Sequence, residues 1–305
     1  MRVVALRRVR RGEMAEWSMA VVLKTTEPER VPGVRIPLSP PAFAKRSIRS
    51  RLRPGKPSTM SEERTTLWLA ALEARHLADL TFSETARALR ALSSCYVERR
   101  ARVGAALDTK GKRAAFALFY APLHFVAVRE VVRAISDATS SIKHIHDLGC
   151  GTGSAGAAWA LECGRPRVEG VDRHPWAVAE ANWTYRELGL SGRATLGDVD
   201  RVTLGAERGN GILAAYTVNE LPESTRDALL PRLLAAHERG ARVLIVEPIA
   251  RRMAPWWDAW EKAFAAAGGS AGEWRFTTPL PQRQRDLGKA AGLDPRELTA
   301  RSLWL

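Results

Sequence analysis

The fold of this chain is decided by residues 142–153, which read IKHIHDLGCGTG. The first seven of these residues alternate between apolar and polar side chains, which is the period of a half-buried β-strand. The last five contain three glycines at alternate positions, and glycine adopts left-handed backbone conformations that let the main chain approach a ligand closely. The stretch therefore predicts a strand that runs straight into a tight glycine-rich turn.

Segments downstream of this turn alternate between short apolar runs and helical periods. Further strands are predicted at 167–172, 211–217, 242–247 and 298–305. Helices are predicted at 154–162, 175–188, 224–237 and 256–267. Strands that alternate with helices are typical of βαβ units, so the sequence predicts an α/β domain whose mainly parallel sheet has helices on both faces.

Residues upstream of the first strand show only helical patterns. Leucine and alanine recur every three or four positions between 65 and 102, which predicts two or three amphipathic helices. A further helix is predicted at 113–137, where Pro122 should kink or restart it. Its apolar part, 114–128, is shorter than the ~20 residues needed to cross a bilayer, so we predict a cytoplasmic protein without a membrane span. The helices of residues 60–138 are predicted to form a cap on the α/β domain at 139–305.

The first 59 residues differ in composition from the rest of the chain. They contain 14 basic and 4 acidic residues, a net charge of +10 out of +14, so the remaining chain carries only +4. Their Pro, Arg and Ser content predicts a disordered extension. Codons for Val34-Arg35-Ile36-Pro37 can spell the T-loop of a transfer RNA gene, and codons for residues 13–17 and 21–26 can spell other parts of a serine tRNA. We therefore predict that translation begins at Met60, with a native basic tail as the alternative.

Two acidic residues lie at informative positions around the glycine turn. The glycines alone satisfy GxGxxG at 151–156, a pattern also found in dinucleotide-binding sites. Asp147 lies two positions before the first glycine, where a carboxylate would repel a pyrophosphate but suits a ligand with an ammonium group. Asp172 ends the next predicted strand, about 20 residues further along the chain, where a carboxylate can accept hydrogen bonds from ribose hydroxyls.

The run Asp147-Leu148-Gly149-Cys150-Gly151-Thr152-Gly153 resembles the first motif of class I methyltransferases. The resemblance implies a Rossmann-like sheet and the cofactor S-adenosylmethionine, whose methionine portion the acidic residue and the glycines would hold. Gly197-Asp198-Val199 looks like the third motif of that family, in which the acidic residue meets the adenine amino group. The predicted cofactor-binding residues are Asp147, Gly149, Cys150, Gly151, Gly153, Asp172, Asp198 and Val199. For Cys150 a packing role is the alternative.

The predicted acceptor side follows the strand at 211–217, where residues 218–222 read VNELP. Substrates of α/β sheets bind at the carboxyl ends of the strands, so Asn219 and Glu220 are predicted to border the transferred methyl group. Glu220 is the candidate base, and capping of the next helix together with Ser224 is the alternative. Methyl transfer to a nucleophilic atom proceeds largely by positioning, so catalysis does not require a strong base.

Two other groups of side chains could carry chemistry. His144 and His146 alternate on the first strand, but with no third ligand in view they are interpreted as strand residues, and no metal site is predicted. Trp256, Trp257 and Trp260 fall on one predicted helix, where they could stack flat substrates or pack beneath a lid.

A looser resemblance, over residues 92–252, is to the small-ribosomal-subunit methyltransferase-like family of mitochondria and bacteria. It is carried by short pieces: LSSCY at 92–96, YAP at 120–122, NEL at 219–221 with Arg226, and VEP at 246–248. The C-terminal cysteine cluster of that family, which is associated with an iron–sulfur centre, has no counterpart in this sequence. The resemblance implies RNA or the small ribosomal subunit as a partner.

The sequence leaves functions of two classes open. One is an active S-adenosylmethionine-dependent methyltransferase, acting on ribosomal RNA, on a small molecule or on a protein. The other is a catalytically silent ribosome-assembly factor that has the same fold. A charge of +4 on residues 60–305 separates them only weakly, because a strong preference for nucleic acid would need a larger basic excess.

Overall fold

The computed structural model describes residues 59–98, 107–135, 138–139, 142–249, 254–277, 280–293 and 297–305. The predicted extension at 1–59 therefore lies outside the described residues, except for Thr59, which begins the first helix. The predicted start of translation at Met60 stays a prediction.

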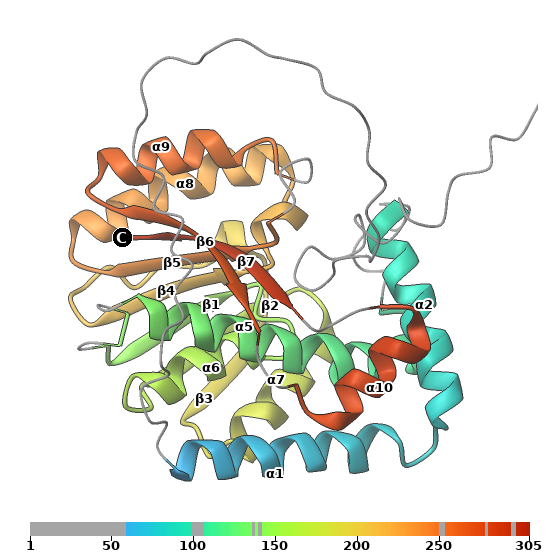
Figure 1. The fold of residues 1–305 in the computed structure, drawn as a ribbon. Helices are drawn as coiled ribbons and strands as arrows, with labels where there is room; N and C mark the ends of the chain where they lie inside the picture. The colour runs from blue at the N-terminus through green and yellow to red at the C-terminus, as the bar shows by residue number, and fades with distance from the viewer. Residues whose placement is uncertain are drawn as a thin grey trace, which may run out of the picture.

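A seven-stranded sheet forms the centre of the described part of the chain (Figure 1), in the order β3-β2-β1-β4-β5-β7-β6. Its strands are β1 (His144–Leu148), β2 (Arg167–Asp172), β3 (Gly192–Leu196), β4 (Asn210–Ala215), β5 (Arg242–Glu247), β6 (Ser270–Phe276) and β7 (Leu298–Trp304). The first five pair in parallel, whereas β7 runs antiparallel to both of its neighbours. The structure thus confirms the predicted Rossmann-like α/β sheet.

Two strands that the sequence did not predict lie at the two edges of the sheet. In β3 only Ala194 is buried, and in β6 only Trp274 is buried. An edge strand with so few buried side chains leaves no apolar run and no clear alternation, so pattern analysis cannot recognise it. The central strands β2 and β5, which are mostly buried, begin and end at the predicted residues.

Helices cover both faces of the sheet. One face is covered by α5 (Ala121–Ala134), α6 (Ser154–Glu162) and α7 (Pro175–Glu187), and the other by α8 (Glu223–Glu238) and α9 (Trp257–Ala266), as Figure 1 shows. Each face has its own cluster of buried side chains. The sequence predicted both sets of helices because each presents an apolar face to a strand.

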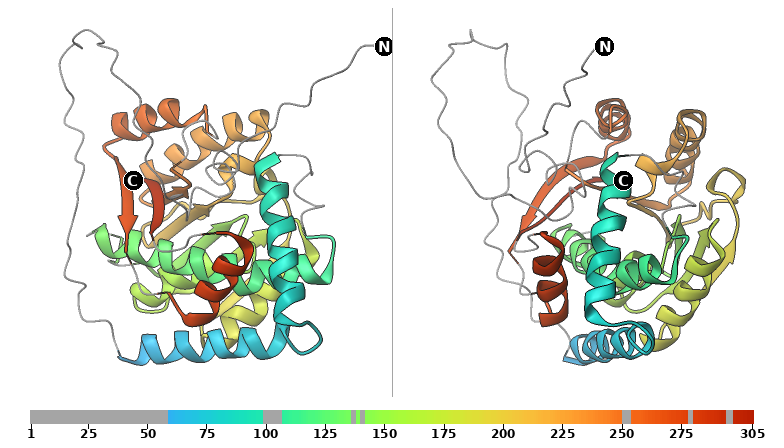
Figure 2. Two further views of the ribbon diagram at one scale, coloured as in Figure 1. Left: turned by 45° about the vertical axis from the view of Figure 1, so that its right-hand side comes forward. Right: turned by 90° about the vertical axis from the view of Figure 1, so that its right-hand side faces the viewer.

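The N-terminal helices lie on the α5 and α7 side of the sheet, as the two views of Figure 2 show. They are α1 (Thr59–His76), α2 (Phe82–Glu98) and α4 (Lys110–Ala115), joined by α10 (Gln282–Ala291) from the other end of the chain. Trp68 of α1 and Leu89 of α2 belong to the same buried cluster as Trp159 of α6 and Trp304 of β7. The cap and this face of the sheet therefore share one hydrophobic core, whereas the division at residue 138 stays a prediction.

A buried ion pair fixes α1 against α7. The carboxylate of Glu180, of which 1% is exposed, lies 2.7 Å from Nε2 of His76 and 3.2 Å from Nε of Arg75. The guanidinium of Arg75 also lies over the ring of Trp183, 5.0 Å from its centroid. A buried charge must be paired, so these contacts specify how α1 packs on the domain.

The longest helical run, Lys110–Ala134, contains α4, the π-helical turn η1 (Phe116–Tyr120) and α5. The restart expected at Pro122 takes the form of this π-turn, after which Pro122 occupies the first turn of α5. Contrary to the prediction from sequence, the run is long and apolar enough to cross a membrane by length and composition, but 78% of its apolar window is buried inside the fold. It packs here as the core helix of the cap.

Candidate cofactor and acceptor site

The glycine turn between β1 and α6 adopts the conformation that the sequence predicted. Gly149, Gly151 and Gly153 have φ values of +64°, +52° and +76°, all in the left-handed region. A residue with a Cβ would be strained at each of these positions. The turn thus places successive backbone N–H groups at the carboxyl end of β1 and at the start of α6, where they can face a ligand.

The three glycines differ in what surrounds them. A Cβ on Gly149 would lie 2.4 Å from Cγ2 of Thr217, and one on Gly153 would lie 2.8 Å from the ring of Tyr185. A Cβ on Gly151 would meet nothing within 4 Å. Gly149 and Gly153 are therefore required for packing, whereas Gly151 exposes its backbone to open space in which a cofactor could lie.

Asp172 connects the glycine turn to the end of β2. Its Oδ2 accepts a hydrogen bond from the Gly151 N–H at 2.9 Å, and its Oδ1 accepts one from the His174 N–H at 2.8 Å. The side chain is half-buried, as is Gly151 of the turn. A carboxylate has about four lone-pair sites, so Asp172 retains the capacity to accept the two ribose hydroxyls that the sequence assigned to it.

Asp147 is deeply buried, with 1% of its surface exposed. Its Oδ2 accepts a hydrogen bond from the Gly156 N–H at 3.1 Å, in the first turn of α6. Burial, reinforced by the nearby charge of Asp172, raises the pKa of Asp147 to about 7. The carboxyl group therefore fixes the start of α6 against β1, and its contact with an ammonium group stays a prediction.

Cys150 packs within the turn. It is 5% exposed, and burial raises the pKa of its thiol well above the ordinary value. A Cβ on Gly170 of β2 would lie 2.8 Å from its Sγ and 2.9 Å from the Tyr185 phenol oxygen, so these side chains fill the space that Gly170 leaves. The thiol has a packing position, and only the backbone of Cys150 is placed to contact a cofactor.

The predicted adenine-binding residues follow β3. Asp198 is exposed and lies just before the short helix η2 (Val199–Arg201), to which its side chain makes no capping hydrogen bond. Val199 is 8% exposed and packs into the cluster beneath α8. The carboxylate of Asp198 can reach a ligand from this position, whereas Val199 can contribute only its backbone.

The acceptor-side residues lie on the short helix η3 (Val218–Glu220), directly after β4. Asn219 is held from two sides: its N–H donates to Oε1 of Glu247 at 3.2 Å, and its Oδ1 accepts from Nε1 of Trp256 at 2.9 Å. Glu220 is exposed. The predicted capping role of Glu220 and Ser224 is wrong, because α8 begins after Pro222 and has no side-chain cap.

Sequence reasoning did not select Glu247, which the structure places beside Asn219. Glu247 ends β5 and is fully buried, and burial raises the pKa of its carboxyl group to about 8. Its Oε1 holds Asn219, while its Oε2 has no hydrogen-bond partner among the described residues. The available signal was an acidic residue at the end of an otherwise apolar strand, where a charge is unexpected.

The histidines of β1 and the tryptophans around the start of α9 were the other candidates for chemistry. His146 lies on the surface of β1, with its ring nitrogens 3.4 Å from Oδ1 of Asn210 and 3.8 Å from Oε2 of Glu169. Among the described residues, no group of three or more His, Cys, Asp or Glu side chains is arranged to hold a metal ion. Trp257 and Trp260 are buried in the core beneath α9, as the packing alternative expected.

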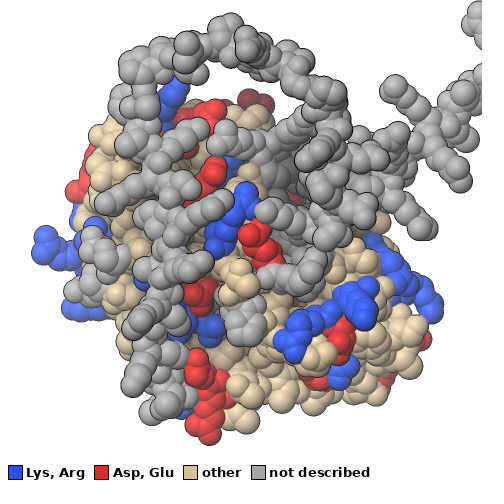
Figure 3. Space-filling model, viewed as in Figure 1, with Lys and Arg blue, Asp and Glu red and all other residues tan. Residues whose placement is uncertain are grey.

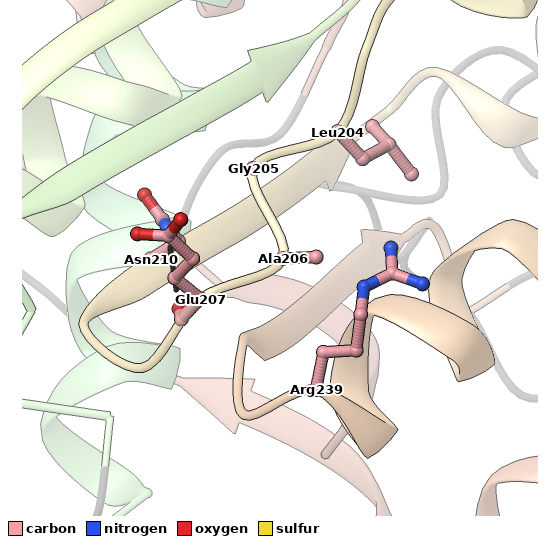
Figure 4. Close-up of a pocket in the computed structure, with 6 residues that line it drawn as sticks. All are labelled: Leu204, Gly205, Ala206, Glu207, Asn210 and Arg239. Atoms are coloured by element: carbon pink, nitrogen blue, oxygen red, sulfur yellow. Dashed lines mark hydrogen bonds between the residues drawn. The ribbon is translucent and has the colours of Figure 1, made fainter.

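A hollow of about 540 Å³ lies at the amino ends of the strands, whereas the candidate site lies at their carboxyl ends. Figure 4 shows the residues that line it: Leu204, Gly205, Ala206, Glu207, Asn210 and Arg239. Asn210 is the first residue of β4, so the hollow borders the amino ends of the strands. Ligands of such sheets bind at the carboxyl ends, and this hollow is therefore not the cofactor site.

Comparison with known proteins identifies the domain. Residues 145–240 match the family model described as "Methyltransferase domain". This range begins in β1, contains the glycine turn, Asp172 and η3, and ends after α8. This part of the chain is therefore similar to a methyltransferase domain. No curated protein has a sequence that matches this chain.

Solved structures with a similar arrangement have low sequence identity. The YcgJ protein of Bacillus subtilis is 12% identical, with a TM-score of 0.38, over 59% of this chain and 95% of its own. Magnesium protoporphyrin IX methyltransferase of Synechocystis PCC 6803, solved with bound S-adenosylmethionine, is 15% identical, with a TM-score of 0.38, over 59% and 79% of the two chains. The methyltransferase domain of bacterial CtHen1 is 12% identical, with a TM-score of 0.41, over 59% and 97%.

Proposed function

We propose that this chain binds S-adenosylmethionine at the carboxyl edge of its sheet and transfers the methyl group to an acceptor beside β4 and β5. The observation that carries this proposal is the left-handed turn at Gly149, Gly151 and Gly153, whose half-buried middle residue donates its N–H to Asp172. The turn and the carboxylate together form a cradle for a nucleoside. The methyltransferase domain match covers both.

The cofactor, when bound, supplies an electrophilic methyl group on a sulfonium. The residues of this chain would then bind the cofactor and orient the acceptor toward it. The turn at 149–153 would receive the methionine portion, Asp172 the ribose and Asp198 the adenine. The acceptor would lie next to Asn219, whose orientation is fixed by Glu247 and Trp256. Holding the two reactants in line lowers the barrier without a strong base.

Titration calorimetry with S-adenosylhomocysteine tests the binding step. We expect saturable binding by the wild-type chain, and binding at least tenfold weaker by Asp172→Asn, because a charge-assisted hydrogen bond contributes about 1.5–3 kcal/mol. Asp200→Asn, which changes an exposed carboxylate on η2, serves as the matched control. Equal affinities for all three proteins would contradict the assignment of the ribose to Asp172.

For the acceptor, we propose ribosomal RNA as the first substrate to test. The support is the looser family resemblance through Asn219-Glu220-Leu221 and Val246-Glu247-Pro248, which the structure brings together by the hydrogen bond between Asn219 and Glu247. Basic and acidic side chains are interspersed on the face drawn in Figure 3, so charge alone does not select this acceptor. Transfer of radiolabelled methyl groups into RNase-sensitive material of a cell extract would support it. Label in a small-molecule fraction would favour that substrate class, and tight cofactor binding without transfer would favour a silent assembly factor.

A further inference from the structure

Aromatic side chains of the cap line the carboxyl edge of the sheet. Phe116 and His124 lie two turns apart on one face of the run from η1 to α5, and their rings are 6.0 Å apart. Phe116 also meets Trp176, in the first turn of α7, at 6.4 Å. His124 stacks on Tyr216, directly after β4, at 4.0 Å with 21° between the ring planes. The cap thus reaches from the end of β2 to the end of β4, across the edge where the cofactor and acceptor would meet.

Tyr216 has an unusual backbone conformation. Its φ is +57°, in the left-handed region that a bulky residue rarely adopts, while its N–H donates to the Val246 carbonyl at 2.8 Å. Strained residues persist only where the surrounding structure holds them, and they cluster at ligand sites. Here the conformation places the phenol ring against His124 of the cap.

Three polar atoms in this region are buried and have no hydrogen-bond partner among the described residues. They are Nε2 of His124, the phenol oxygen of Tyr216 and Oε2 of Glu247. The first two belong to the stacked rings, and Glu247 follows the residue whose carbonyl binds the Tyr216 N–H. Each such atom is costly when desolvated, and the Glu247 carboxyl lies near enough to the Tyr216 phenol to raise its pKa, so a ligand that entered here would supply the missing hydrogen bonds.

All three groups are uncharged near neutral pH. Burial lowers the pKa of His124 to about 3, raises that of Glu247 to about 8 and raises that of Tyr216 above its ordinary value. The charged groups that face Glu247 are Glu220 on η3 and Arg301 on β7, and the guanidinium of Arg301 lies over the Trp257 ring at 3.9 Å. A negatively charged acceptor would therefore face the carboxyl groups of Glu220 and Glu247. The guanidinium of Arg301 already stacks on the Trp257 ring, so it does not offset them.

We propose that His124, Tyr216 and Glu247 form the polar wall of the methyl-acceptor site, and that the acceptor group is an uncharged planar ring with hydrogen-bond donor and acceptor atoms. This inference rests on the proposed methyltransferase function. The aromatic faces favour a flat partner, because rings stack on rings. The three unpaired polar atoms require a partner that can both donate and accept hydrogen bonds.

The test uses the full chain saturated with S-adenosylhomocysteine and, separately, the chain without it. Uracil is the uncharged planar probe, while benzoate and inorganic phosphate are the anionic probes. Dissociation constants are measured by ligand-observed NMR. We expect uracil to bind, and to bind at least fivefold more weakly to Tyr216→Phe, which keeps the phenyl ring without its hydroxyl, and to His124→Phe, which replaces the imidazole by an aromatic ring without nitrogen atoms. Thr184→Val, which removes a buried unpaired hydroxyl on α7, is the matched control and should bind uracil as the wild type does.

The outcomes separate the two proposals. Failure of S-adenosylhomocysteine to bind, with uracil binding intact, would refute the cofactor assignment but not the polar wall. If uracil does not bind, binds equally to all variants, or binds more weakly than benzoate or phosphate, the wall is occupied by ordered water only and the inference is wrong. A uridine hexamer that binds tighter than uracil would place the ring in an RNA chain, whereas equal affinities would place it in a free heterocycle.

Discussion

The buried carboxyl group of Asp147 makes a quantitative prediction about the pH dependence of stability. In the folded chain this group has a pKa of about 7 and keeps its proton below that pH, whereas in the unfolded chain it ionises near its ordinary pKa of 3.8. Between these values the folded state binds more protons than the unfolded state, so the contribution of Asp147 to stability falls as the pH rises. The physical cause is the cost of burying the ionised form of this carboxylate, which the folded chain would have to meet at high pH.

The magnitude follows from the difference between the two pKa values. A tenfold change in a protonation equilibrium corresponds to about 1.4 kcal/mol, so the contribution of Asp147 decreases by a few kcal/mol, on the order of 3, between about pH 5 and pH 8. Asp147→Asn removes the titration but retains an oxygen that can accept the Gly156 N–H. We therefore expect the free energy of unfolding of the variant, relative to the wild type, to rise by roughly this amount over the same interval.

Urea denaturation of both proteins at pH 5, 6.5 and 8 measures this difference. Glu247 titrates in the same direction in both proteins, so it cancels in the comparison. Asp198→Asn, which changes an exposed carboxylate, is the matched control for the change of Asp to Asn. A difference between Asp147→Asn and the wild type that stays constant with pH would refute the argument that this carboxyl is protonated in the folded chain at neutral pH.

Three further predictions concern the turn, the cofactor and the cap. Gly151→Ala should weaken S-adenosylmethionine binding at least tenfold, as measured by calorimetry, while lowering stability by only about 1 kcal/mol, because its Cβ would enter open space. Gly149→Ala should instead lower the midpoint of thermal unfolding strongly, because its Cβ would clash with the strand end, and similar midpoints for the two variants would contradict the packing difference. S-adenosylmethionine should bind more tightly at pH 8 than at pH 6, because its ammonium group favours the ionised form of Asp147; an affinity independent of pH would argue against that proximity. Glu180→Ala leaves His76 unpaired and should destabilise the chain by about 3 kcal/mol, with faster hydrogen exchange in α1 as its specific signature.

The sequence by itself predicted the glycine turn and the acidic residues beside it. Asp147, the three glycines and Asp172 lie on two consecutive strands and one turn, and the roles of these residues depend on local backbone geometry. A glycine required at positive φ and an acidic residue at a strand end are visible without the tertiary structure. The fold class followed for the same reason, because buried central strands have apolar runs that mark them in sequence.

The edge strands β3 and β6 and the helix α10 were decided by the tertiary structure. Only Ala194 is buried in β3, and α10 buries polar Gln284, whose Nε2 donates to the Leu118 carbonyl in the cap at 2.8 Å. Such elements have little apolar periodicity of their own. They form because a neighbouring strand or helix supplies their hydrogen bonds and contacts.

The acceptor side was also decided by the tertiary structure. Sequence reasoning selected Glu220, which is exposed, and missed Glu247, which is buried and holds the Asn219 backbone. It gave no sign that His124 of the cap would stack on Tyr216. Burial, and the pKa shifts and unpaired atoms that result from it, depend on which distant segments meet. A single sequence records the order of those segments but not their contacts, so this half of the site could only be found from the folded chain.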